Sequence, residues 1–441
     1  MPHVSFVALS GFRIHDPVLR ELGMTLPGFD ERAQALAALP ALGLITLAGL
    51  LPEHWTCSYV APAAVTPELL DAIQQQRPDL VAISALTASI EEAYQLSDAL
   101  RAAGRTTVLG GLHVTACPEE AARHASSIVV GPAEPVWTQL LEDVQGNRLQ
   151  LRYGEARRPE SEDRGDWPLP RFDLLGEVQR YTLQTQRGCP LACDFCAASR
   201  LLERFREKPA ANIARELEAI QACCPDPLIE LADDNTFAGS RDPFELLDVL
   251  EASGARWFTE SDWRLGERPQ VLARLGGAGC VQVLMGIESM VFRYPGMGGK
   301  QAELERMLDA VHAIQGAGVA VNGCFIVGAD GETPASLQRL TAFLLESPFA
   351  DVQITLQTPF PGTALRERLA RQNRLLPELG WPHCSLFEVT YQPDLLSVPE
   401  LEQGFREVLT HVFAAASTQR RRSLRRDVWR RNRRLRRVPV A

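Results

Sequence analysis

Lysine, cysteine and long apolar runs are all scarce in this 441-residue sequence. Only Lys208 and Lys300 are lysines, and this bias toward arginine has little mechanistic content by itself. The ten cysteines are too few to form a disulfide-rich scaffold in a chain of this length. No apolar run reaches the roughly 18 residues of a membrane-spanning helix, and the opening residues lack the basic segment of a signal peptide. These features predict a cytoplasmic globular protein.

Charge is distributed unevenly. The 45 basic and 55 acidic residues give a net charge of −10, yet eleven arginines lie between Arg420 and Arg437, beside one acid, Asp427. Subtracting these leaves 34 basic and 54 acidic residues, a net charge of −20. An acidic body argues against nucleic-acid binding. The basic tail suits a peripheral membrane of anionic lipid or an acidic carrier protein, and a solvated helix without a partner explains it equally well.

Short apolar runs alternate with helical segments over residues 1–147. Such alternation predicts an α/β fold whose parallel sheet is covered on both faces. We expect five strands, at Val4–Leu9, Trp55–Val60, Leu80–Ser84, Thr106–Leu109 and Ser127–Val130. Five strands predict a flavodoxin-like, doubly wound domain with any ligand at the carboxyl ends of the strands.

A polar, proline-bearing stretch at 148–178 is predicted to be a linker, after which the alternation resumes. Residues 179–370 hold six strand–helix units, two short of a closed barrel, and so predict a partial (β/α)6 barrel. The expected strands are Thr182–Gln186, Leu228–Leu231, Trp257–Ser261, Val281–Gly286, Val319–Val327 and Val352–Leu356. Residues 371–441 predict a C-terminal helical region that ends in the arginine-rich tail.

Three cysteines are clustered directly after the first expected barrel strand. Cys189, Cys193 and Cys196 have the spacing C-x3-C-x2-C. Three such thiolates can bind three irons of a [4Fe–4S] cluster and leave the fourth iron open. A structural zinc site would need a fourth ligand, for which Cys223 and Cys224 are the candidates. Buried thiols without metal are the remaining alternative.

The cysteine motif resembles that of the radical S-adenosylmethionine (SAM) superfamily. The resemblance implies that the open iron chelates SAM and that one electron from the cluster cleaves SAM to a 5′-deoxyadenosyl radical. It also implies an external electron donor such as flavodoxin or ferredoxin. Segments at the later strand ends match the family pattern in order through residue 370, and the residues they imply for SAM binding are Phe195, Asp233, Asp234, Ser261, Glu288 and Asn322. An Asp-Asp-Asn turn is also an ordinary helix cap.

A flavodoxin-like domain before such a barrel resembles the cobalamin-binding branch, whose methyltransferases are called class B. Small residues at strand ends let a bulky tetrapyrrole approach the backbone. The implied cobalamin contacts are Ser84, Thr87, Gly110, Gly111, Gly131 and Glu134. The Asp-x-His-x-x-Gly pattern of one cobalamin family is absent after the first strand. We therefore expect His15 and His113 to be ordinary polar loop residues and not cobalt ligands.

The resemblance implies a cobalamin-dependent radical SAM methyltransferase, which moves a methyl group from SAM through methylcobalamin to an unactivated carbon of a small-molecule, lipid or natural-product substrate. Its cofactors would be a [4Fe–4S] cluster, SAM and cobalamin, and no side chain is assigned as a catalytic acid or base. Two alternatives stay open. One is a non-methylating reaction of the same cofactors, such as cyclisation, ring contraction or rearrangement. The other is a cobalamin or iron–sulfur sensor without turnover.

Overall fold

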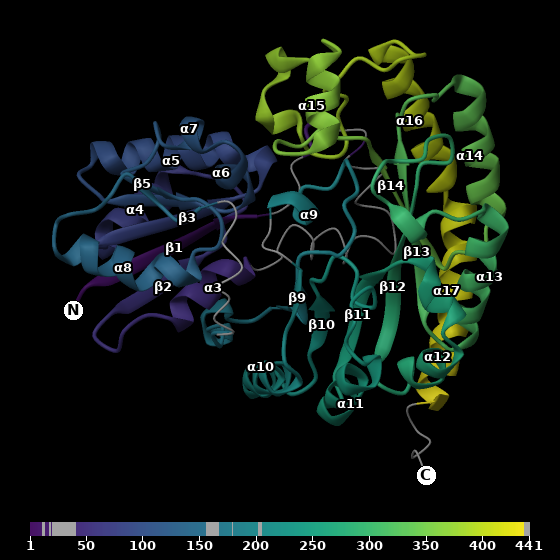
Figure 1. Ribbon diagram of the computed structural model, residues 1–441, viewed down its shortest axis with the longest axis horizontal. Coiled ribbons are helices and arrows are strands. Elements are labelled where there is room, and N and C mark those ends of the chain that lie inside the picture. The colour runs from purple at the N-terminus through teal and green to yellow at the C-terminus, as the bar shows by residue number, and fades with distance from the viewer. Residues whose placement is uncertain are drawn as a thin grey trace.

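Two parallel six-stranded sheets lie side by side in the computed structural model, with the N-terminal sheet on the left of Figure 1 and the larger C-terminal unit on the right. The structure describes residues 1–10, 14–16, 19, 41–155, 167–178, 180–201 and 205–435. Part of the segment that follows the first strand, residues 11–13, lies outside this description. Among the described helices, none is long and apolar enough to cross a membrane.

The N-terminal sheet has the strand order β2-β1-β3-β4-β5-β6, and every neighbouring pair is parallel. Its strands are β1 (His3–Leu9), β2 (Thr56–Val60), β3 (Leu80–Ala85), β4 (Thr107–Gly110), β5 (Ser127–Val129) and β6 (Arg152–Tyr153). The five predicted strands are confirmed within two residues at each end. The doubly wound order is also confirmed, because β1 is the switch point from which the chain winds in both directions.

Helices cover both faces of this sheet, as the strand pattern predicted. One face is covered by α4 (Pro67–Gln76) and α5 (Ile90–Ala102), together with the short helices α6 (Leu112–Ala116) and α7 (Pro118–Ala121). The other face is covered by α3 (Leu42–Gly49) and α8 (Glu134–Gln145). Trp137 of α8 is fully buried against Phe6 of β1, with ring centroids 5.9 Å apart. Two apolar faces leave only the strand ends for a ligand.

The C-terminal sheet has the order β14-β13-β12-β11-β10-β7, so that each strand pairs with the next along the chain. Its strands are β7 (Tyr181–Leu183), β10 (Leu228–Leu231), β11 (Arg256–Ser261), β12 (Cys280–Glu288), β13 (Ala320–Val327) and β14 (Asp351–Leu356). Its outer helices are α10 (Ala210–Cys223), α11 (Pro243–Ser253), α12 (Pro269–Leu275), α13 (Leu304–Gly316) and α14 (Pro334–Glu346). Since β7 and β14 do not pair, the predicted partial barrel is confirmed.

Two details differ from the sequence prediction. The first barrel strand was expected to run to Gln186, but β7 ends at Leu183, and β8 (Gln186–Arg187) pairs antiparallel with β9 (Arg206–Glu207). The stretch 148–178 is also more than a linker, because it supplies the edge strand β6 and buries Tyr153, Trp167 and Phe172. A two-residue strand and isolated aromatic residues give no periodic signal in a polar sequence.

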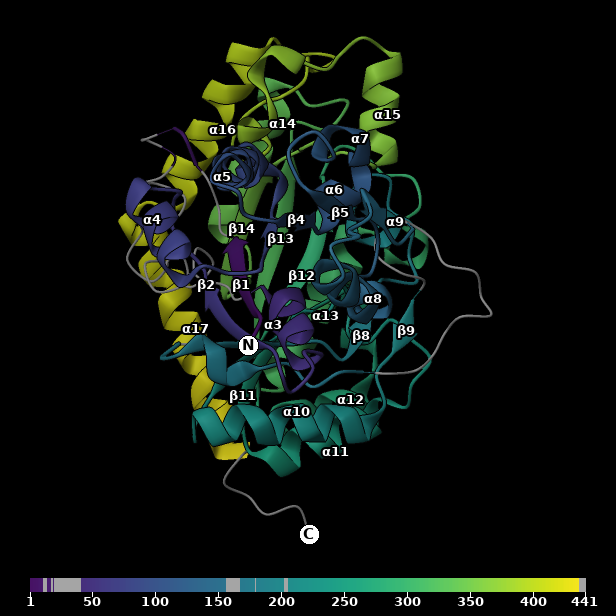
Figure 2. The same ribbon diagram turned by 90° about the vertical axis from the view of Figure 1, so that its left-hand side faces the viewer.

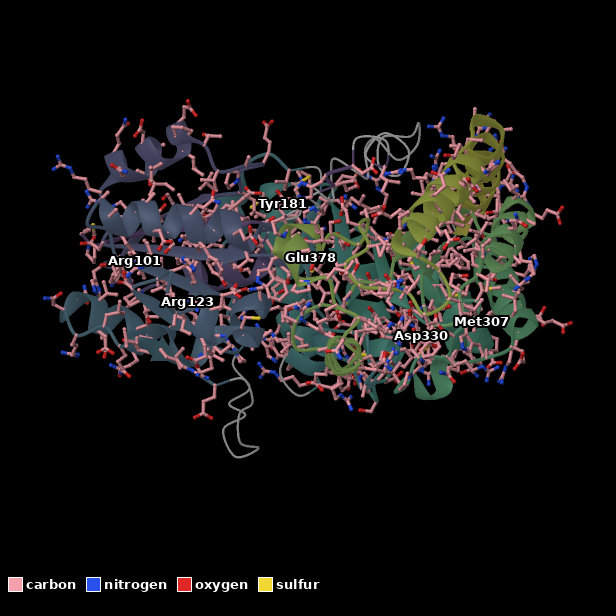
Figure 3. The ribbon with its side chains drawn as sticks, turned by 90° about the horizontal axis from the view of Figure 1, so that it is seen from above. Arg101, Arg123, Tyr181, Met307, Asp330 and Glu378 are labelled. Carbon is pink, nitrogen blue, oxygen red and sulfur yellow. The ribbon has the colours of Figure 1, made fainter. Side chains whose placement is uncertain are left out.

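The C-terminal region packs back onto the barrel. After α15 (Ala364–Arg371), a loop segment reaches the N-terminal domain, and α16 (Val398–Val412) then packs beside α14. The arginine-rich helix α17 (Ala415–Leu435) runs along the same side of the molecule toward the C-terminus (Figures 1 and 2). Figure 3, a view from above, shows Arg101 and Arg123 of the N-terminal domain on the left and Met307 and Asp330 of the barrel unit on the right.

Part of the arginine tail is therefore an integral part of the barrel. Val428 packs on Ala320 and Ala350, and Asn432 donates to the Cys280 carbonyl at 2.6 Å. Arg425 donates to Asp351 at 2.7 Å. These contacts show that α17 packs on the barrel and is not fully solvated, which corrects that part of the alternative. Arg437 lies outside the described residues.

Candidate active site

The three clustered cysteines lie on the loop that follows β8. Cys193 is buried, whereas Cys189 and Cys196 are half-buried. The loop turns tightly, since the Cys196 N–H donates to the Cys193 carbonyl at 3.1 Å. Burial raises the pKa of Cys189 and of Cys193 to about 11, and the neighbouring thiols act in the same direction. The free cysteines are thus protonated, and a bound metal would displace those protons.

This donor set fits a [4Fe–4S] cluster. The cysteines of such a cluster bind different irons, so the thiols surround a volume and need not converge on one point. In the described part of the chain, no three His, Cys, Asp or Glu side chains are placed to hold a single metal ion. Cys223 ends α10 and Cys224 follows it, just before β10, so both lie at the amino edge of the sheet, opposite the cysteine loop.

An apolar wall surrounds the cysteine loop. Phe195 makes an edge-to-face contact with Tyr294, with ring centroids 4.7 Å apart, and Cys193 packs with Tyr294 and Met297. This wall comes from residues 289–300, a loop that the sequence analysis did not assign to the site. The Asp194 N–H donates to the Pro295 carbonyl at 2.9 Å, which ties the two loops together.

Glycine is required at one point of that contact. Gly296 has a φ of +82°, and a Cβ built there would lie 1.9 Å from the Ala192 carbonyl oxygen. No residue with a side chain can approach the cysteine loop this closely. The 289–300 segment is therefore held against the cysteine loop by a backbone-to-backbone contact.

Asp233 stabilises the chain and is not free to bind a ligand. Its Oδ1 accepts from the Thr185 and Gln186 N–H groups at 2.7 and 3.1 Å. Its Oδ2 accepts from the hydroxyls of Thr185 and Thr236 at 2.5 and 2.9 Å. Four donors use all the acceptor positions of a carboxylate. These hydrogen bonds leave Asp233 without a free acceptor position for the expected SAM contact, and they fasten the start of the cysteine segment to the end of β10.

The neighbouring Asp234 is half-buried, and burial together with Asp233 raises its pKa to about 6. Ser261 ends β11 and lines a cavity of about 190 Å³ with Asn235 and Arg264. These positions remain compatible with the predicted role in SAM binding. Asn322 differs, because it is 0% exposed and, among described residues, neither of its amide atoms has a hydrogen-bond partner. A ligand can reach Asn322 only if neighbouring side chains move.

Glu260 was missed as a site residue. It lies one position before Ser261, in register with Leu284 of β12, which is in turn in register with Asn322 of β13. Burial within the sheet, followed by the charges of Asp234 and Glu230, raises the pKa of Glu260 to about 8. Glu260 is nevertheless exposed to solvent. The charge of Glu260 is coupled to that of Asp234, so the two carboxyls lie near each other at the carboxyl ends of β10 and β11.

Glu288 and Lys300 form a buried ion pair above β12. Their side chains are 9% and 15% exposed. Glu288 has a φ of +67°, an unusual backbone conformation for a residue with a side chain. Lys300 lowers the pKa values of Cys189 and Cys193 against the effect of burial, so its charge lies close to the thiols.

The N-terminal domain presents glycines at its facing edge. Gly111 has a φ of +107°, and a Cβ there would lie 3.0 Å from Ser84 Oγ. Gly131 has a φ of +75°, and its N–H donates to Thr115 at 2.9 Å. A Cβ on Gly110 would meet only Val129, at 3.8 Å or more. This cradle without side chains fits a flat macrocycle that approaches the backbone.

Other predicted cobalamin contacts have protein partners. Thr87 Oγ1 lies 3.3 Å from His113 Nδ1. Glu134 forms an ion pair with Arg187, two residues before Cys189. This ion pair joins the glycine cradle of one domain to the cysteine loop of the other.

His113 is a buried helical residue, 1% exposed on α6, and not the loop residue that we expected. Burial lowers its pKa well below the usual value. Trp381 packs edge-on against His113, with ring centroids 4.9 Å apart, and donates to Glu120 at 3.0 Å. His15, in contrast, lies in a loop as expected, 3.1 Å from the Pro382 carbonyl. Both histidines therefore contact the C-terminal region.

Comparison with known families agrees with this geometry. Residues 32–141 match the model of the B12 binding domain, and residues 183–344 match the model of the radical SAM superfamily. The chain thus carries a B12 binding domain followed by a radical SAM domain. These two domains imply cobalamin, a [4Fe–4S] cluster and SAM as cofactors.

Similar proteins include several methyltransferases. Bacteriochlorophyllide d C-12(1)-methyltransferase of Chlorobaculum tepidum is 24% identical over 358 residues, which are 78% of this chain and 76% of its own. The anaerobic magnesium-protoporphyrin IX monomethyl ester cyclase of Cereibacter sphaeroides is 22% identical over 77% of this chain and 62% of its own.

Solved structures share the fold. OxsB, a cobalamin-dependent SAM radical enzyme, matches with a TM-score of 0.67 at 15% identity, over 92% of this chain and 66% of its own. The radical SAM methyltransferase TsrM of Kitasatospora setae matches with a TM-score of 0.60 at 14% identity, over 84% of this chain and 78% of its own. Both likenesses concern the fold.

Proposed function

We propose that this radical SAM enzyme is a cobalamin-dependent C-methyltransferase acting on an unactivated carbon of a small-molecule, lipid or natural-product substrate. The observation that carries the proposal is the ion pair between Glu134 and Arg187, because it brings the glycine cradle beside the cysteine loop. Methyltransferases among the similar proteins support the same assignment.

The chemistry of the bound cofactors would be a hydrogen-abstracting radical from SAM at the cluster and a methyl group supplied by cobalamin. The chain's own residues hold and shield these groups. Cys189, Cys193 and Cys196 would bind three irons, and Gly110, Gly111 and Gly131 would leave room for the macrocycle. Phe195, Tyr294 and Met297 exclude water from the space beside the thiols.

Asp234, Ser261 and Glu288 would orient SAM. Each lies at the carboxyl end of a parallel strand, the edge at which ligands of such sheets bind. Asp234 carries negative charge above its pKa of about 6, which suits a cationic ligand such as SAM.

The test is a count of co-products per turnover. Cobalamin-loaded enzyme with a reconstituted cluster should form S-adenosylhomocysteine and 5′-deoxyadenosine in equal amounts, with a product 14 mass units heavier per methyl group. A cyclase among the similar proteins makes a non-methylating reaction the second candidate. Deoxyadenosine alone, with a product of unchanged carbon count, would support that candidate instead.

A further inference from the structure

Only two lysines are present in the sequence, and both form buried ion pairs with a glutamate. Lys208 pairs with Glu216, with side chains 4% and 1% exposed and the nearest atoms 2.7 Å apart. Lys300 pairs with Glu288. A buried ion pair is costly to desolvate and is seldom retained for stability alone. The two pairs differ in their surroundings, and this difference indicates a role for one of them.

The chain makes room for the Lys300–Glu288 pair. A Cβ built on Gly286 would lie 2.4 Å from Lys300 Nζ and 2.4 Å from Glu288 Oε1. Gly286 has an ordinary φ, so the need for glycine here is a need for space and not for an unusual backbone conformation. The ammonium group therefore lies directly over the backbone of β12.

The lysine is also fixed from the outside. Trp263 Nε1 donates to the Lys300 carbonyl at 2.7 Å, and the Lys300 N–H donates to the Met297 carbonyl at 3.1 Å. Met297 packs against Cys193, and Pro295 in the same loop accepts from Asp194. The loop that positions Lys300 is thus the loop that covers the cysteines.

We propose that Lys300 is a positioning residue for the cluster, whose fixed positive charge, partly offset by Glu288, sets the reduction potential of the [4Fe–4S] centre. Reduction adds one electron to the cluster, from [4Fe–4S]²⁺ to [4Fe–4S]⁺, and the electron comes from an external one-electron donor. A fixed cation nearby stabilises the more negative reduced form, and the low dielectric of the apolar wall strengthens this effect.

The two members of the pair should act in opposite directions. In Lys300→Met the loss of a positive charge should lower the potential, so that the ratio of reduced to oxidised cluster at the wild-type midpoint falls about tenfold, equivalent to 59 mV for one electron. In Glu288→Gln the loss of a negative charge should raise it. Lys300→Arg should restore the wild-type value, and Gly286→Ala should lower the potential because the added methyl group displaces the ammonium.

The experiment is an EPR-monitored redox titration of the reconstituted full chain, without SAM, cobalamin or substrate, together with iron and sulfide analysis. Lys208→Met is the matched control, because it breaks the other buried pair and should destabilise the fold without moving the potential. Full iron with a wild-type potential in Lys300→Met would overturn the proposal, as would shifts of the same sign in both pair variants.

If Lys300→Met retains no iron, Glu288→Gln decides the question, since an unchanged potential there would also overturn the proposal. The inference depends on the cluster and not on the proposed methyl transfer. Because the titration contains no SAM or substrate, its outcome is independent of the co-product count that tests the function.

Discussion

The two sheets present opposite chemistry at their carboxyl ends. The N-terminal sheet presents Gly110, Gly111 and Gly131, whereas the C-terminal sheet presents thiols, carboxylates and a lysine. A cradle of glycines recognises a large ligand by shape and close approach. An edge rich in ionisable groups recognises charge and adjusts the energy of electrons and protons. We therefore expect the N-terminal edge to hold its cofactor by shape, and the C-terminal edge both to hold its cofactor and to adjust that cofactor's reactivity.

Removing one cysteine of the C-terminal edge should change the iron content of the protein more than any other substitution. Cys196→Ala should reduce the iron of the reconstituted protein from about four per chain to near zero, because a cluster with two cysteine ligands is not retained. Iron and sulfide analysis measures this loss. Cys57→Ala, which removes a half-buried thiol in the N-terminal domain, should keep all the iron. Stoichiometric zinc in place of iron in the wild-type protein would contradict the assignment.

The next substitution breaks the glycine cradle. Gly110→Trp should abolish cobalamin retention, normally about one per chain, while the iron content stays unchanged, because the indole occupies the open space beside the backbone. Absorbance of the protein after gel filtration with hydroxocobalamin measures retention. Gly43→Trp is the control, since Gly43 lies on a helix with no atom within 4 Å of an added Cβ. Equal retention of cobalamin in both variants would show that the cobalamin site is not at this edge.

Contact between the two halves depends partly on Trp381. Trp381→Ala removes the hydrogen bond to Glu120 and the ring contact with His113, and should lower the free energy of unfolding by about 2–3 kcal/mol. Trp381→Phe keeps most of the ring contact and should lose about half as much. Denaturant titration of the full chain measures both losses, and equal losses would assign the whole effect to the hydrogen bond.

The His113 side of this contact predicts a pH dependence. Because burial lowers the folded-state pKa of His113, the unfolded chain binds more protons than the folded chain below about pH 6.5. The contribution of His113 to the free energy of unfolding is therefore largest above pH 6.5, and it declines as the pH falls toward the lowered pKa. His113→Gln should flatten the stability curve between pH 7 and pH 5. An unchanged slope would show that His113 does not titrate differently in the two states.

The smallest effects distinguish the two sides of α17. Arg425→Met breaks a half-buried ion pair with Asp351 and should cost about 1–3 kcal/mol. Arg433→Ser changes an exposed residue and should stay within about 0.5 kcal/mol of wild type. Thermal unfolding measures both. Equal effects would mean that the helix does not pack on the barrel as described.

Patterned features could be predicted from the sequence. The bounds of β10 agree to the residue, because a compact apolar run marks this strand. The cysteine motif was found because its spacing is local. Gly296, Lys300 and Glu260 were not, since their roles depend on contacts between segments far apart in the chain. Asp233 and Asp234 are adjacent in sequence, and only the fold shows that Asp233 accepts four hydrogen bonds within the chain while Asp234 is a half-buried carboxyl with a raised pKa.

In the proposed function, the N-terminal edge holds cobalamin, the C-terminal edge holds the cluster, and methyl transfer needs both. The most direct measurement compares SAM-derived co-products of Cys193→Ala and Gly110→Trp, each incubated with SAM, cobalamin and a strong reductant. We predict that Cys193→Ala forms no 5′-deoxyadenosine, whereas Gly110→Trp still forms 5′-deoxyadenosine but no S-adenosylhomocysteine. Loss of both co-products in both variants, with folding and iron content intact in Gly110→Trp, would contradict the claim.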